Sequence, residues 1–149
     1  MHKQLFTQKN NNSVIYWLTL VLTAVFIMVL IGGITRLTDS GLSMVEWKPI
    51  LGFLPPLNHE EWLRVFELYK TTPEYNFYNK GMEIHEFKTI FFWEYFHRLW
   101  GRLIGIIFII PFLFFLKNKR LTKGNTLKLI FILFLGSFQA FIGWWMVKS

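Results

Sequence analysis

The sequence predicts an all-α integral membrane protein, in which three transmembrane helices form an incomplete four-helix bundle and a helical outer loop joins helices one and two. Composition is the first reason. The 149 residues are 53% hydrophobic and include 17 Phe and 7 Trp, and the mean hydropathy is +0.36, which is too apolar for one small soluble core. The second reason is three separate apolar runs, each near the roughly 20 residues that cross a bilayer.

We expect one membrane domain over residues 1–149. Its first helix is longer than the apolar core of about 7–15 residues in a signal peptide, so we expect it to remain as an anchor. Asn58, followed by Glu61, has the pattern of a helix N-cap and predicts a short amphipathic helix in the outer loop. The expected elements, in chain order, are helix 14–34, outer loop 35–92 with its short helix at about 59–71, helix 93–116, cytoplasmic loop 117–126 and helix 127–147.

The distribution of charge predicts the orientation. Basic residues without acidic ones occupy the amino-terminal tail and the 117–126 connector, whereas the outer loop carries more acidic than basic residues. By the positive-inside rule, the amino terminus and the connector face the cytoplasm. The net charge of +7 therefore reflects membrane topology, and we expect no nucleic-acid partner. Cysteine is absent, which excludes disulfides and thiolate metal sites.

A polar stripe lies at the start of the second helix, in the stretch "FFWEYFHRLWGRLIG". Glu94, His97 and Arg98 share a face with Gly101 and Gly105 at about 100° per residue. Ionisable groups at membrane depth usually mark a functional site. A haem would use all these residues, since imidazole ligates iron, Arg neutralises propionates and glycines leave room for a macrocycle. The alternative is structural, with a Glu94–Arg98 ion pair and a His that bonds between helices.

Three blocks of the chain resemble the amino-terminal half of haem A synthase, in its cysteine-free proteobacterial and mitochondrial form. They are "GGITRLTDSGLSMVEWKPILGFLPPL", "EFKTIFFWEYFHRLWGR" and "GSFQAFIGWWMVKS". The resemblance implies an eight-helix oxidoreductase of two four-helix bundles, which oxidises the C8 methyl of haem O to a formyl group for cytochrome oxidase assembly. It also implies that the amino-terminal bundle receives haem O as substrate, that the carboxy-terminal bundle holds a haem B cofactor, and that haem O synthase is a partner.

The E-x-x-H-R motif of that family falls on Glu94, His97 and Arg98. The resemblance implies that His97 is an axial ligand of the haem iron and that Glu94 is the acid associated with oxidation of the methyl group. Our assignment of Arg36 and Arg98 to the haem propionates is a physical inference, because both lie at the outer rim of the predicted bundle.

The family pattern continues beyond Ser149, so we expect a truncated or split amino-terminal half, completed by the missing carboxy-terminal half or by a second copy. Small-residue faces on the second and third helices predict a homo-oligomer in membrane lipid. The amino-terminal tail lacks transit-peptide character, which favours a bacterial inner membrane. Two alternatives to catalysis stay open: a membrane haem-binding module without activity, and a structural piece that docks on an assembly partner.

Overall fold

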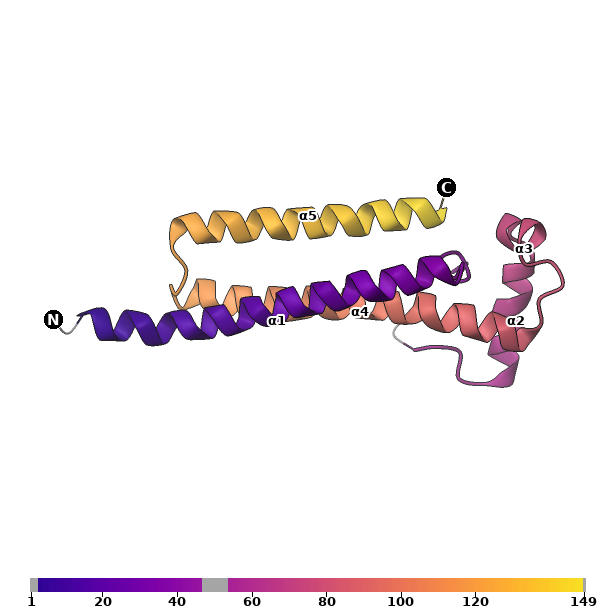
Figure 1. Ribbon diagram of the computed structural model, residues 1–149, viewed down its shortest axis with the longest axis horizontal. Helices are drawn as coiled ribbons and strands as arrows, with labels where there is room; N and C mark the ends of the chain where they lie inside the picture. The colour runs from indigo at the N-terminus through magenta and orange to yellow at the C-terminus, as the bar shows by residue number, and fades with distance from the viewer. Residues whose placement is uncertain (1–2, 47–53, 149) are drawn as a thin grey trace. The chain divides into compact units, whose positions relative to one another are not determined.

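The computed structural model describes residues 3–46 and 54–148. Every regular element in these ranges is a helix, and α1, α4 and α5 contain stretches long and apolar enough to cross a membrane. The predicted fold class, an all-α membrane protein with three spanning helices, is confirmed. The helices in chain order are α1 (Lys3–Leu37), α2 (His59–Lys70), α3 (Pro73–Phe77), α4 (Ile84–Lys117) and α5 (Lys123–Lys148) (Figure 1).

The chain divides into two compact units. The first consists of Met1–Val25 and Ile104–Ser149, and the second of Phe26–Leu103. Both α1 and α4 therefore contribute one part of their length to each unit. The residues of the predicted polar stripe fall in the second unit, apart from Gly105.

The first unit has its core around Trp17 of α1, which is 6% exposed. The indole Nε1 donates a hydrogen bond of 2.9 Å to the backbone oxygen of Ile107. The rings of Phe108 and Phe115 lie 5.5 and 5.4 Å from the indole between centroids, and Leu129 of α5 is buried in the same cluster. One aromatic side chain thus joins α1, α4 and α5 within this unit.

Helix α5 is otherwise sparsely covered. Only 6% of its most apolar window is buried. The small-residue face predicted for this helix consists of Gly136, Gln139, Ala140 and Gly143; the first three are exposed and Gly143 is half-buried. Such a face accommodates lipid or another helix, because small residues let a neighbouring backbone approach closely.

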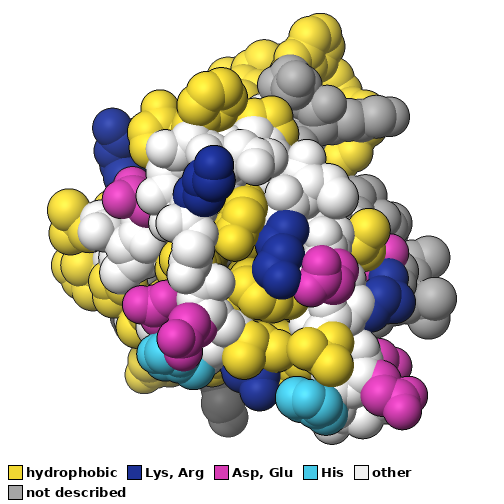
Figure 2. All heavy atoms as spheres, turned by 90° about the vertical axis from the view of Figure 1, so that its right-hand side faces the viewer, with side chains coloured by type: hydrophobic (Ala, Val, Ile, Leu, Met, Phe, Trp, Pro, Cys, Tyr) yellow, Lys and Arg dark blue, Asp and Glu magenta, His cyan; other side chains and the backbone are white. Residues whose placement is uncertain are grey.

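The second unit contains the outer loop helices. Helix α2 starts where the sequence predicts a cap, since the Asn58 side-chain oxygen accepts a 2.8 Å hydrogen bond from the backbone N–H of Glu61. Its buried face carries Phe66 and Tyr69, which pack on Phe87 of α4. Acidic and basic side chains are interspersed on the face of the molecule shown in Figure 2, as expected for a water-facing surface.

Tyr69 gives this aromatic cluster a predictable response to alkaline pH. Its side chain is fully buried, and its hydroxyl oxygen accepts a 2.7 Å hydrogen bond from the Asn79 amide. Burial raises the pKa of the Tyr69 phenol, whereas an unfolded tyrosine ionises near pH 10. Above about pH 10 the Tyr69 phenol therefore stays protonated in the folded state after it has ionised in the unfolded state. The contribution of Tyr69 to the free energy of unfolding is complete below about pH 10 and declines above that pH.

We expect the free energy of unfolding to fall more steeply between about pH 9 and 11 in the wild type than in Tyr69→Phe. Thermal unfolding followed by circular dichroism across this range measures the difference. Tyr78→Phe is the matched control, because Tyr78 is 78% exposed. Identical pH dependence in the wild type and Tyr69→Phe would contradict the prediction.

Candidate functional site

Glu94 is the buried carboxylate of the site. It lies on α4 and is 3% exposed. Its Oε2 atom accepts a hydrogen bond of 2.7 Å from the Ser43 hydroxyl and another of 2.7 Å from the Met44 backbone N–H. Two donors from one short segment therefore hold one carboxylate oxygen.

Arg98, one turn further along α4, engages the other oxygen. Its Nη2 atom pairs with Oε1 of Glu94, and the side chains of Arg98 and Glu94 are 11% and 4% exposed. The same Nη2 donates a 3.3 Å hydrogen bond to the backbone oxygen of Met44. The ion pair considered in the structural alternative is thus present, and it fastens the loop after α1 onto α4.

The turn that ends α1 brings Ser43 to this position. Backbone N–H groups of Thr38 and Ser40 donate to carbonyls in the last turn of α1 at 2.9 Å each, and Asp39 adopts a left-handed conformation with φ of 49°. Asp and Asn tolerate this conformation better than most residues. Ser40 and Ser43 are buried behind the turn, at 0% and 2% exposed. The local chemistry of the turn therefore aims the Ser43 hydroxyl at α4.

His97 lies in a different environment from Glu94. The imidazole is half-buried and faces α1 at Gly32, where a Cβ atom would stand 3.5 Å from Nε2 and 3.8 Å from Cδ2. Within the described part of the chain, neither ring nitrogen has a hydrogen-bond partner. The stripe predicted from helical spacing thus separates into a carboxylate bound to the loop and an imidazole beside a glycine.

The donor chemistry at His97 fits a haem iron. A half-buried imidazole with an uncommitted nitrogen is the ligand that haem proteins use, and a larger residue than Gly32 would take up space beside that nitrogen. No group of three or more His, Asp or Glu residues that could hold a metal ion occurs in residues 3–46 and 54–148.

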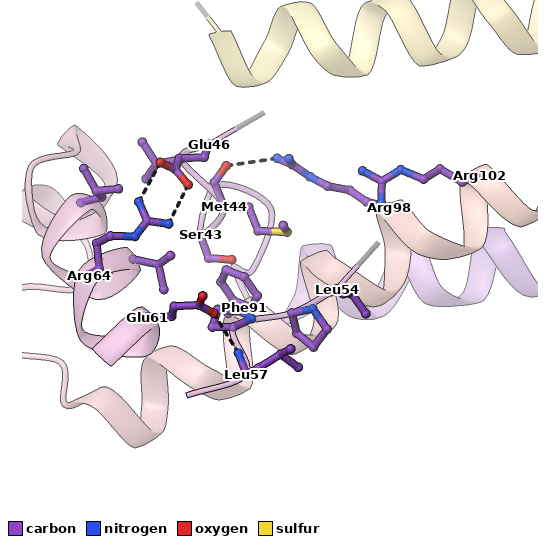
Figure 3. A pocket seen from close by; sticks show the side chains of 15 residues that line it. Ser43, Met44, Glu46, Leu54, Leu57, Glu61, Arg64, Phe91, Arg98 and Arg102 are labelled. Carbon is purple, nitrogen blue, oxygen red and sulfur yellow. Dashed lines mark hydrogen bonds and ion pairs between the residues drawn. The ribbon is translucent and has the colours of Figure 1, made fainter. Parts of the chain in front are cut away.

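The predicted propionate contacts have different surroundings. Arg98 lines a pocket of about 270 Å³ in the second unit together with Arg102 (Figure 3). Arg36 is exposed in the last turn of α1 and does not line this pocket. The rest of the described lining is mainly apolar, and its charged members are Arg64, Glu46 and Glu61. Arg64 and Glu46 are joined by two hydrogen bonds of 2.8 and 3.0 Å, and the Glu61 carboxylate accepts a 3.0 Å hydrogen bond from the Leu57 backbone N–H.

Sequence reasoning missed three residues of the site. Ser43 and Met44, in the loop after α1, bind the Glu94 carboxylate of α4, about fifty positions further along the chain. Gly32 of α1 faces His97 of α4. No local pattern in the sequence identified what the turn after α1 would contact.

Comparisons with known proteins agree with the resemblance. Residues 15–149 match the family model described as cytochrome oxidase assembly protein. The haem A synthase of Parvibaculum lavamentivorans is 50% identical over 143 residues, 96% of this chain and 42% of that protein. The haem A synthase of Rhizobium meliloti is 53% identical over 96% of this chain and 39% of its own length.

The haem A synthase of Nitrosospira multiformis is 55% identical over 133 residues, which are 89% of this chain and 37% of that protein. The chain therefore spans about two fifths of the length of the curated relatives that it matches. No solved structure matches it significantly.

Proposed function

The chain belongs to the cytochrome oxidase assembly protein family, and from its haem A synthase relatives we propose that it acts in haem A biosynthesis. In this proposal it provides the amino-terminal half of a multi-pass membrane oxidoreductase of the bacterial inner membrane, with its amino terminus in the cytoplasm. The substrate is haem O, whose C8 methyl becomes a formyl group. The observation that carries the proposal is identity of 50% or more to haem A synthases over nearly the whole chain.

In this proposal we assign a binding role to three residues of the site. His97 ligates the iron of haem O through a ring nitrogen, and the half-buried setting beside Gly32 supports that task. Arg98 and Arg36 bind propionates at the outer rim; for Arg98 the support is its place at the pocket, where a guanidinium can hold an acidic group. The haem B cofactor, which supplies electron transfer when bound, is assigned to the carboxy-terminal half of the complete enzyme.

Glu94 has a more constrained task. Arg98, Ser43 and Met44 occupy both of its carboxylate oxygens, so the carboxylate is fixed in orientation before any substrate arrives. Fixed charges cost no reorganisation during a reaction and can stabilise charge that develops nearby. We therefore assign Glu94 to electrostatic support of methyl oxidation.

A second candidate function follows from the same contacts. Because Glu94 is engaged by its own protein, the carboxylate can also serve only to hold the loop, and the chain then binds haem without oxidising it. Formation of haem A in membranes that contain this chain together with the remaining part of a haem A synthase distinguishes the two. Haem binding without conversion would support the binding module.

Haem binding through His97 is the first test. We expect the detergent-purified 149-residue chain to shift the Soret band of added haem, with saturation near one haem per chain or per dimer, and His97→Ala to abolish the shift. His85→Ala is the matched control on the same helix, because the His85 side chain is 73% exposed and paired with Glu83. A shift that survives in His97→Ala, or none in the wild type, would contradict the proposed site.

A further inference from the structure

The contact between His97 and Gly32 has a sharply defined geometry. A methyl group added to Gly32 would stand 3.5 Å from Nε2 of the imidazole and 3.8 Å from Cδ2. These are ordinary van der Waals distances, so an alanine can be accommodated without displacing either helix. It would nevertheless occupy the space immediately beside the nitrogen.

A Cβ atom added to Gly33 or Gly101 would not meet an imidazole. A Cβ on Gly33 would meet nothing within 4 Å, and one on Gly101 would meet only the flexible Met28 side chain, at 3.4 Å from Cε. Among the glycines in the described part of the chain, Gly32 is the one whose missing side chain faces a histidine. Its position is therefore distinct from a general small-residue helix contact.

We propose that Gly32 is a ligand-access residue, which keeps open the space beside Nε2 of His97 that a metal-centred macrocycle needs. The inference rests on the proposed function. An imidazole nitrogen binds a metal at about 2.0–2.1 Å, and a flat macrocycle extends sideways from that metal in every direction. A methyl group 3.5 Å from the nitrogen would reduce the space available to such a ring beside it.

The proposal predicts a specific loss of haem affinity in Gly32→Ala. The probe is iron protoporphyrin IX, titrated into the detergent-purified chain, with the Soret shift giving Kd and thermal unfolding by circular dichroism giving the stability of the free protein. We expect Kd to rise about tenfold to hundredfold, the range that overpacking produces, while the melting temperature of the free protein stays at the wild-type value.

Gly33→Ala is the matched control, because it adds a methyl group one residue away in open space. We expect it to retain the wild-type Kd. Unchanged affinity in Gly32→Ala, an equal loss in Gly33→Ala, or a Gly32→Ala chain that no longer folds would each overturn the inference.

These outcomes are separable from failure of the proposed function. If the wild type shows no His97-dependent Soret shift, the haem site itself is wrong and the inference falls with it. If the wild type shows the shift and Gly32→Ala shows it equally, the site stands and only the role of Gly32 is wrong.

Discussion

Glu94→Gln is expected to lower the free energy of unfolding by about 3–5 kcal/mol, the usual cost of removing one partner of a buried ion pair. Gln keeps one oxygen for the Ser43 hydroxyl and the Met44 N–H, but its amide group offers no charge to Arg98. The Arg98 side chain is only 11% exposed, so hydration of its guanidinium compensates little for the lost carboxylate. The measurement is denaturation of the detergent-solubilised chain with far-ultraviolet circular dichroism.

Two further variants make this prediction specific. Glu67→Ala removes an acid whose side chain is 66% exposed and paired with Lys70, and it should cost no more than about 1 kcal/mol. Combining Glu94→Gln with Arg98→Met removes both buried charges and should recover part of the loss. If Glu94→Gln costs as little as Glu67→Ala, the buried network does not stabilise the loop.

This expectation affects how functional data on Glu94 should be interpreted. Because Glu94 fastens the loop containing Ser43 and Met44 to α4, its replacement disturbs the fold as well as the chemistry. Loss of haem A formation in a Glu94 variant would therefore not by itself identify a catalytic carboxylate. Activity must be compared with the measured stability of the same variant.

Trp17→Ala is expected to destabilise the first unit by about 3 kcal/mol. The indole packs on Phe108 and Phe115 and donates to the Ile107 oxygen, so truncation leaves a large cavity. We expect the lower end of the 3–5 kcal/mol seen for aromatic truncations, because lipid and detergent tails are as apolar as the core and reduce the transfer contribution.

Trp17→Phe separates the hydrogen bond from the packing and should cost about 1–3 kcal/mol. Pro111 of α4 has no N–H to donate to the Ile107 carbonyl four residues earlier, so the indole N–H takes the place of that helix donor. Trp145→Ala is the control for tryptophan removal, because Trp145 is 61% exposed on α5. All three variants are compared by detergent-phase unfolding. Equal effects of Trp17→Ala and Trp145→Ala would show that the cluster around Trp17 contributes no more than a lipid-facing side chain.

The sequence by itself determined the elements and the class of the protein. Apolar runs of membrane-spanning length predicted three helices, and the Asn58 cap predicted the start of α2, because both signals depend on residues close together in the chain. The spacing of Glu94, His97 and Arg98 also placed them on one face, since helical periodicity is local. The resemblance of three sequence blocks to haem A synthase identified the family correctly.

Only the tertiary structure decided what each side chain of that face contacts. Glu94 meets Ser43 and Met44, which are about fifty positions away, and His97 meets Gly32 on another helix. Neither contact leaves a periodic trace in the sequence, because a hydrogen bond or a van der Waals contact depends on distances in space, and helical spacing fixes only the direction in which a side chain leaves its own helix.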